Sequence, residues 1–389
     1  MGQLHRLDNS KPCRLLPVCI LGLLCYYSGL GTLSGAERVL EAVKSEAATF
    51  DVLRVVDGLH HPWGFEFLPD GGLLITERRG RLLHWHGGER REVSGLPEIA
   101  NVGQGGLMDI LLDPDFTENQ TLFFAYAARY DGGVGTRVAR ARLDEGFELQ
   151  DVTVIFSMNP PGRGGRHFGC RLAWHPDGSL FVSIGDRGDQ NRAQQLDSHH
   201  GSLLRIDRDG RPHPENPFLN RDGAQPEIFS YGHRNAQGLW IDPNSGTIWQ
   251  NEHGPQGGDT LNAVEMGGNY GWPLATYGEE YGGGRIGVQP NQRQDIINPL
   301  LHWTPSIAPS GLSGFVGDAV PGWQGNLFNG ALRGMHLRRV VVEDGQVVHQ
   351  EELLLHAIGR IRQVRQGPDG LLWLCTDERS GGIYKLVPR

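Results

Sequence analysis

Short apolar runs alternate with glycine-rich turns along the chain from about residue 50 onward. The clearest copies begin with a Pro-Asp-Gly type turn, which leads into an apolar strand, a polar loop and a second apolar strand. No window shows a sustained apolar period of 3.6 residues, so we expect no long helices. Six copies are found, the second and the fifth being weaker, and their turns lie at residues 69–72, 113–116, 176–178, 243–246, 321–323 and 368–370.

Six repeated strand-turn units predict an all-β fold, a six-bladed β-propeller with four-stranded blades. An all-β sandwich is the alternative, but that fold would not require six similar sequence units. In a propeller, the loops that connect successive blades meet at the mouth of a central channel, where we expect the functional site. The extra length between the third and fifth units, including residues 277–294, predicts long loops over that face.

The amino-acid composition is consistent with such a fold. The chain has 57 glycines among 389 residues, roughly twice the usual share of ~7%, as expected for many tight turns. Its 36 lysines and arginines against 45 aspartates and glutamates give a net charge of −9, with no basic block. This charge argues against a nucleic-acid partner, which would require a basic surface.

The N-terminus has the pattern of an export signal. Basic residues precede an apolar run over residues 15–27, and Ser34-Gly35-Ala36 offers a cleavage site made of small residues. We predict a signal peptide over residues 1–36, a propeller domain over residues 37–389, and a periplasmic or secreted protein. An uncleaved membrane anchor is the alternative, although the apolar run is shorter than the ~20 residues that a spanning helix needs.

Three of the five cysteines lie in that N-terminal segment, which leaves Cys170 and Cys375 in the propeller domain. Two cysteines cannot form the disulfide framework of a small secreted domain. We expect two buried free thiols rather than a disulfide, so that the stability of the fold comes from its core and any bound metal.

Four stretches carry residues that suit catalysis or ligand binding. The first is the glycine-rich segment 162–171, in which His167 comes just before an apolar strand. A histidine titrates near neutral pH and can act as a general base, while a hydrogen-bonded structural histidine is the alternative. The segment lacks the Lys-Ser/Thr pair of a phosphate-binding loop. Neither a Ser-His-Asp order nor a zinc-type cluster of histidine and cysteine stands out in the chain.

The second and third stretches carry groups that could bind an anion and a cation. In residues 231–239, Arg234 and Asn235 could bind an anionic or carbonyl-rich ligand, since arginine supplies a planar fork of donors. Alternatively, Arg234 and Asn235 could have a purely structural role and link neighbouring blades. Residues 252–259 contain a Gly-Pro turn with Asp259 nearby, and oxygen atoms of this kind suit a hard cation such as Ca²⁺.

The fourth stretch is Arg360-Ile361-Arg362, whose alternation places both guanidinium groups on one face of a strand. Two arginines on one face repel each other unless they face acidic groups or an anion. The partner could be an acidic residue of the protein or a carboxylated ligand. Gln104 and Arg333 are weaker candidates of the same kind.

A series of motifs occurs in the order found in the soluble aldose sugar dehydrogenases that depend on pyrroloquinoline quinone (PQQ). The chain resembles this family over nearly everything after residue 50. GHRNxQG together with EHGP and GRIR is a specific signature, whereas any one of them alone is not. The motifs are HPWG at 61–64, TER at 76–78, GQGGLMD at 103–109, HPDG at 175–178, GHRNAQG at 232–238, EHGPQGGD at 252–259, NYGWP at 269–273, APSG at 308–311 and GRIRQVRQGPDG at 359–370.

The resemblance implies a quinoprotein oxidoreductase that oxidises aldose sugars at C1 to lactones. The quinone would lie flat in the channel mouth on a Ca²⁺ ion, which polarises a quinone carbonyl. By resemblance, His167 removes the proton of the C1 hydroxyl while hydride passes to the quinone. Arg234 would stabilise the charge that develops on the quinone oxygen.

The resemblance also implies binding positions. Gln104 matches the sugar-binding position of the family, and the carbonyl oxygens of Gly254 and Pro255 match its Ca²⁺ ligands. Several arginines match the group that neutralises the quinone carboxylates, although the family often has lysine where Arg333 stands. The full set of matching cofactor positions is Arg234, Asn235, Ser306, Arg333, Arg360 and Arg362.

Two residues depart from the family pattern. Arg166 stands at a substrate position where the glucose-oxidising branch has an acidic residue, so the resemblance carries no preference for glucose. Thr260 follows Asp259 where the family often has glutamate, a ligand of a second, structural Ca²⁺ ion shared with the Tyr270 carbonyl. The resemblance therefore leaves that second metal site open.

Two other functions are alternatives to the sugar dehydrogenase. A Ca²⁺-dependent sugar lactonase would need a central metal held by several carboxylates, whereas these candidate positions are rich in arginine and histidine. A non-catalytic propeller that binds protein partners would be favoured by loss of His167 or of the GRIR pair, and both are present. The motifs leave open the natural sugar, the electron acceptor (a quinone or a cytochrome) and the choice between monomer and homodimer.

Overall fold

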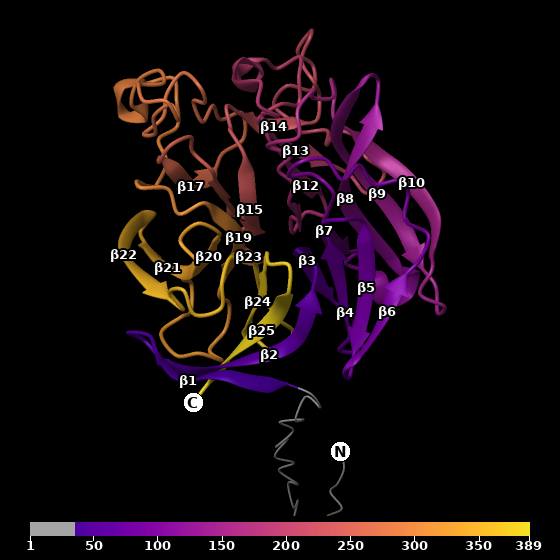
Figure 1. Cartoon of the computed structure of the whole chain (residues 1–389). Coiled ribbons are helices and arrows are strands. Elements are labelled where there is room, and N and C mark those ends of the chain that lie inside the picture. The colour runs from indigo at the N-terminus through magenta and orange to yellow at the C-terminus, as the bar shows by residue number, and fades with distance from the viewer. Residues whose placement is uncertain (1–35) are drawn as a thin grey trace, which may run out of the picture. The chain divides into compact units, whose positions relative to one another are not determined.

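Six antiparallel sheets make up residues 36–389, the part of the chain that the computed structural model describes. Figure 1 shows the sheets in sequential order around a centre. The predicted signal peptide lies outside the described residues except for Ala36. Export therefore stays a prediction, which N-terminal sequencing of the native protein would check.

Each sheet is one blade, and its strands run in order from the innermost to the outermost. Blade 1 contains β3 (Pro62–Phe67), β4 (Leu73–Glu77), β5 (Arg81–His86) and β6 (Glu89–Val93). Blade 2 contains β7 (Leu107–Leu112), β8 (Thr121–Tyr130), β9 (Gly133–Leu143) and β10 (Leu149–Ser157). Blade 3 contains β11 (Leu172–Trp174), β12 (Leu180–Ile184), β13 (Ser202–Ile206) and β14 (Ile228–Tyr231). Blade 4 contains β15 (Ala236–Ile241), β16 (Ile248–Glu252), β17 (Asp259–Val264) and β18 (Leu301–Trp303). Blade 5 contains β19 (Pro309–Gly314), β20 (Leu327–Ala331), β21 (His336–Glu343) and β22 (Gln346–Leu353). Blade 6 contains β23 (Ile361–Gln366), β24 (Leu372–Thr376), β25 (Gly381–Pro388), β2 (Thr49–Leu59) and β1 (Glu37–Lys44).

The innermost strands close a ring, because each of β3, β7, β11, β15, β19 and β23 contacts the next and β23 contacts β3. Each of the six repeated turns joins the innermost strand of a blade to its second strand. The turns therefore share one end of the channel, and the loops that link successive blades share the other. The prediction of a six-bladed β-propeller is confirmed.

The last blade is completed by the N-terminal part of the propeller. Strand β2 pairs antiparallel with β25, so that Phe50 lies opposite Pro388, and β1 adds a fifth strand outside β2. In Figure 1 the indigo β2 lies beside the yellow β25. Pairing the two ends of the chain in one sheet closes the ring by backbone hydrogen bonds.

Helices play little part in this structure, as expected from the lack of a helical period. Residues 36–389 contain one α-helix, α1 (Phe116–Asn119), and two 3-10 helices, η1 (Gln190–Gln194) and η2 (Pro290–Gln292). None of the helices in this part of the chain has the length and apolar character needed to cross a bilayer. The predicted long loop lies between β17 and β18, where the Tyr277 ring stacks on His302 with centroids 4.0 Å apart.

Apolar side chains fill the spaces between neighbouring blades. Between blades 5 and 6, Trp323 packs against Phe50, Phe315 and Phe328 with ring centroids 4.9 to 5.8 Å apart. Both cysteines of the propeller, Cys170 and Cys375, are buried and free, which confirms the expectation of two free thiols. Burial raises the pKa of the Cys375 thiol to about 12, so this group stays protonated and inert.

Candidate active site

The loops that link successive blades enclose a cavity of about 310 Å³ at one end of the channel. All six blades or the loops that lead into them contribute to its lining, through residues such as Trp63, Gln104, Asn235, Ala308 and Arg362. A larger cavity of about 530 Å³ opens at the other end, among the repeated turns, and none of the predicted site residues lines it. The site therefore lies at the predicted end of the channel.

His167 lies in the loop between β10 and β11, with its backbone in the left-handed region at φ 53°. Its Nδ1 is 2.6 Å from Oδ1 of Asp186, a residue that follows β12 and is 1% exposed. Because a carboxylate can only accept a hydrogen bond, Nδ1 carries the proton and Nε2 keeps its lone pair. His167 is thus held in the tautomer that a general base requires.

Asp186 is itself held in place by two further donors. The indole N–H of Trp272 donates to Oδ2 at 2.8 Å, and the backbone N–H of Gly188 donates to Oδ1 at 2.7 Å. Sequence reasoning missed Asp186 as a site residue. The available signal was its position directly after the second strand of blade 3, but its partner lies 19 residues earlier in another loop.

The environment of this pair lowers both pKa values. Burial lowers the pKa of His167 below its usual range, although the hydrogen bond to Asp186 acts in the opposite direction. Burial alone would raise the pKa of the Asp186 carboxyl, but the hydrogen bond and charge of His167 outweigh it, and the pKa is lowered. At neutral pH the pair is therefore a neutral imidazole on an ionised carboxylate.

Gln104 contacts the loop that carries His167. Its Oε1 accepts a hydrogen bond of 2.8 Å from the backbone N–H of His167, and its own backbone N–H donates to the Gly165 carbonyl at 2.7 Å. Gln104 also lines the cavity, where a sugar-binding residue was predicted. The Gln104 side chain therefore helps to position the loop of His167. Phe168 and Gly169 of this loop line the cavity, whereas His167 itself lies beside the lining.

Arg360 and Arg362 both line the cavity, with Arg360 directly before β23 and Arg362 within it. Arg362 donates to Oδ2 of Asp377 at 2.7 Å, so an acidic residue of the protein, one of the two alternatives, contacts this side chain. Arg360 donates to the Leu332 carbonyl at 3.1 Å and forms no ion pair among residues 36–389. Arg78, from the TER motif, is a third arginine in the lining that sequence reasoning missed.

The balance of charge in the lining is positive. Asp377 is the one carboxylate among the residues that line the cavity, and it also contacts Nδ1 of His61 at 2.7 Å. Burial would raise the pKa of Asp377, but the charge of Arg362 and the hydrogen bonds hold it well below its usual range. Within the described residues, the buried Nε atoms of Arg78 and Arg362 have no hydrogen-bond partner. The excess of arginines over carboxylates in the lining favours an anionic ligand.

Arg234 lies beside the cavity in the loop between β14 and β15. Its guanidinium donates to the carbonyl oxygens of Gly254 at 2.6 Å and His253 at 3.2 Å. Asp259 holds this turn, because the Gly254 N–H donates to Oδ1 at 2.9 Å and the Ser306 hydroxyl donates to Oδ2 at 2.7 Å. The structure thus brings the predicted residues Arg234, Gly254 and Ser306 into one network.

His253 is a further lining residue that sequence reasoning quoted only within a motif. Its Nε2–H donates to the Pro309 carbonyl at 2.7 Å. Burial and the charges of Arg362 and Arg234 lower the pKa of His253 to about 3. The imidazole is therefore neutral and has an acceptor nitrogen on its other side.

Other predicted residues lie away from the lining of this cavity. Arg166 lines a neighbouring pocket, and the Arg333 side chain is exposed between β20 and β21. Pro255 is buried in the turn beside Gly254. Tyr270 lines a small cavity of about 30 Å³ next to Arg234, and its hydroxyl donates to a backbone carbonyl at 2.8 Å.

Comparison with known proteins identifies the class. The family of glucose/sorbosone dehydrogenases matches residues 59–385. Aldose sugar dehydrogenase YliI of Escherichia coli is 40% identical over 357 residues, which cover 90% of this chain and 95% of that protein. The crystal structure of the soluble aldose sugar dehydrogenase of E. coli in its apo-form has a TM-score of 0.84 at 40% identity, covering 88% of this chain and 100% of that one. The PQQ-bound form of aldose sugar dehydrogenase from Streptomyces coelicolor has a TM-score of 0.71 at 29% identity, covering 86% and 96% of the two chains.

The fold and these similarities define a sugar dehydrogenase built on a six-bladed propeller. The chain belongs to the glucose/sorbosone dehydrogenase family. The family resemblance inferred from the motifs is confirmed, and so is the prediction that the protein is an enzyme of this class.

Proposed function

We propose that the protein is an aldose dehydrogenase that oxidises the C1 hydroxyl of the sugar to a lactone and uses PQQ and Ca²⁺ as cofactors. The observation that carries this proposal is the His167–Asp186 pair beside a cavity lined by arginines. The relative from S. coelicolor, described as PQQ-bound, supports the choice of cofactor. The aldose sugar dehydrogenase of E. coli supports the substrate class.

The residues of the cavity fit a flat tricarboxylate such as PQQ. Its volume of about 310 Å³ is in the range of small-ligand sites, ~300–1,000 Å³. Arg78, Arg360 and Arg362 line it against the single carboxylate of Asp377. Arginine forks pair well with carboxylates, so these side chains, with Asn235 beside them, would hold the cofactor.

PQQ would supply, when bound, the acceptor for the hydride that leaves C1 of the sugar. The chain supplies the proton transfer, since Nε2 of His167 takes the proton of the C1 hydroxyl. The hydrogen bond to Asp186 stabilises the imidazolium that forms and fixes the orientation of the ring. Loss of the hydride and the proton converts the C1–OH group into the carbonyl of the lactone. Once its guanidinium has turned away from the Gly254 carbonyl, Arg234 would stabilise negative charge that develops on the bound cofactor.

The Gly254-Pro255 turn offers carbonyl oxygens, which are ligands that Ca²⁺ prefers. In this structure the Gly254 carbonyl accepts a hydrogen bond from Arg234, so Ca²⁺ binding at that oxygen requires the guanidinium to turn away. The buried Nε of Arg234 has no partner among residues 36–389.

The lining also bears on the alternative functions. A Ca²⁺-dependent lactonase needs several carboxylates on its metal, whereas Asp377 is the one carboxylate that lines this cavity and it is paired with Arg362. A binding protein has no need of a histidine held in the tautomer of a base. Both observations favour the dehydrogenase.

We expect the purified protein to be inactive until PQQ and Ca²⁺ are added, and then to reduce an artificial dye with several aldoses. Removing Ca²⁺ with a chelator should abolish the activity, and adding it back should restore it. The measurement is dye reduction with each component omitted in turn. Full activity without the quinone, or no activity with any aldose after reconstitution, would show that the proposal is wrong.

Arg362→Ala is expected to weaken the affinity for PQQ by about ten- to hundredfold, with much of kcat regained at saturating quinone. The variant loses a charge-assisted contact to a carboxylate, of order ~1.5–3 kcal/mol. Arg338→Ala, which breaks an ion pair with Glu352 on the outer part of blade 5, is the matched control. If Arg362 serves only to hold Asp377, its loss will lower the Tm and leave the quinone titration unchanged.

A further inference from the structure

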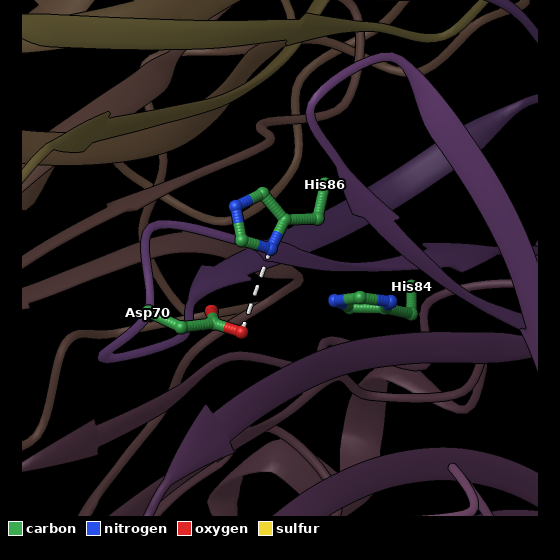
Figure 2. Close-up of side chains that lie close together, drawn as sticks. All are labelled: Asp70, His84 and His86. Atoms are coloured by element: carbon green, nitrogen blue, oxygen red, sulfur yellow. Dashed lines mark ion pairs between the residues drawn. The ribbon is translucent and has the colours of Figure 1, made fainter.

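A second group of side chains, of the types that bind metal ions, lies at the end of blade 1 opposite the cavity. Figure 2 shows Asp70, His84 and His86 close together, and their ligand atoms all lie within 4.8 Å of one another. Strand β3 begins at the cavity with Trp63 and ends before the turn that carries Asp70. The group therefore faces the other end of the channel from the proposed quinone site, and the mechanism does not use it.

The local structure aims these side chains at one point. His84 and His86 alternate on β5, so both lie on the same face of the blade. Asp70 lies in the repeated turn, where its Oδ1 accepts a hydrogen bond of 2.8 Å from the backbone N–H of Gly72. This bond fixes the carboxylate and leaves Oδ2 free, at 3.6 Å from Nδ1 of His86.

His84 has a ring nitrogen that is available to bind a metal ion. Its side chain is 9% exposed, and its buried Nε2 has no hydrogen-bond partner within residues 36–389. The ring is held by stacking on Phe147, with centroids 4.0 Å apart.

A glycine keeps the space between these ligand atoms open. A Cβ atom at Gly72 would lie 2.9 Å from Nε2 of His84 and 3.0 Å from Oδ1 of Asp70. The φ angle of Gly72 is not in the left-handed region, so the backbone conformation does not require glycine here. Glycine is required at this position because any side chain would occupy the space beside Nε2 of His84.

We propose that Asp70, His84 and His86 form a binding site for a divalent transition-metal ion of the zinc type. Two imidazoles and a carboxylate are a ligand set that Zn²⁺ prefers, with bonds of about 2.0–2.2 Å. Two tetrahedral ligands of one such ion are about 3.4 Å apart, so the three ligand atoms, which lie within 4.8 Å of one another, must move closer together when the ion binds. Asp70 and His86 are 54% and 50% exposed, which leaves them free to move toward the buried His84. Water completes the coordination on the open side.

The bound ion would link the turn between β3 and β4 to strand β5. It would therefore stabilise the end of blade 1 that lies opposite the cavity. Ca²⁺ is a poor competitor, because it prefers oxygen ligands in greater number. Zn²⁺ binding at this site and Ca²⁺ binding at the proposed quinone site can therefore be tested separately.

The test is a titration with Zn²⁺ alone, in excess Ca²⁺, on protein purified without a polyhistidine tag and treated with a chelator. We expect one Zn²⁺ per chain and a rise in Tm with Zn²⁺. Co²⁺ should bind in the same place and give the visible spectrum of a nitrogen- and oxygen-ligated ion.

Two variants change exposed ligands and keep the fold. Asp70→Asn retains an oxygen that can accept from the Gly72 N–H, and His86→Ala removes a half-exposed ring. Each should bind Zn²⁺ at least about tenfold more weakly, since even changes outside the ligand shell cost 10- to 100-fold. His349→Ala, an exposed histidine paired with Glu46 on the outside of another blade, should bind Zn²⁺ like the wild type. Absence of saturable Zn²⁺ binding, or equal binding by all four proteins, would overturn the proposal.

Discussion

Replacing His167 with glutamine is expected to lower kcat by about 10²- to 10⁴-fold, the range for loss of a general base. Glutamine keeps the size and polarity of the side chain but cannot accept a proton at neutral pH. The affinity for PQQ should stay nearly unchanged, because the base acts in the transition state and not in cofactor binding. Steady-state kinetics and a quinone titration on the same variant measure the two effects.

The chain offers a matched control for this variant. His175 forms the same kind of pair, with Nδ1 2.9 Å from Oδ2 of Asp177, but it lies in a repeated turn at the other end of the channel. His175→Gln should therefore leave kcat close to the wild-type value. Wild-type kcat in the His167→Gln enzyme would remove the centre of the proposed mechanism.

The direction of the pKa shift of His167 predicts the pH dependence of the wild type. A base works only when neutral, so kcat/KM falls as the pH drops through the pKa of the free enzyme. Burial lowers that pKa below the usual ~6.5. The acid limb of the kcat/KM profile should therefore lie below pH ~6.5, and the rate should be level through neutral pH.

Asp186→Asn is expected to lower kcat by about 10²- to 10⁴-fold, as much as loss of the base itself. The carboxylate accepts hydrogen bonds from His167, Gly188 and Trp272, on both of its oxygens. An asparagine has one acceptor oxygen and must turn an NH₂ group toward one of these donors. His167 then loses its orientation or adopts the tautomer with the proton on Nε2, which cannot act as a base.

The pH profile distinguishes an orienting role for Asp186 from a merely structural one. The carboxylate raises the pKa of His167, so its removal should move the acid limb of kcat/KM to still lower pH. Asp189→Asn, in the same loop but exposed and paired with Arg192, is the matched control and should change neither kcat nor the profile. A lower Tm with unchanged kcat in the Asp186→Asn enzyme would mean that Asp186 serves only the fold.

The architecture could be predicted from the sequence, because the repeated unit is a local structure. Gly71 and Gly178 have φ angles of 85° and 87°, which glycine adopts without strain and which end one strand and begin the next. Six such turns specify six hairpins, and apolar faces on every hairpin can be buried only by stacking the blades. The positions of His167, Arg234 and the Arg360–Arg362 pair relative to the repeated units also predicted that they lie in or beside loops at one end of the channel.

Which side chains meet could be learned only from the folded chain. Closure of the ring brings Phe50 opposite Pro388, and the folding of separate loops brings Asp186 to His167 and Asp377 to Arg362. The motifs showed no zinc-type cluster, yet a turn and a strand bring Asp70 to two histidines. Hairpin turns depend on neighbouring residues, which a sequence shows directly. These pairs depend on the twist of the blades, the closure of the ring and the rotamers in each loop, so residues distant in sequence become neighbours only after folding.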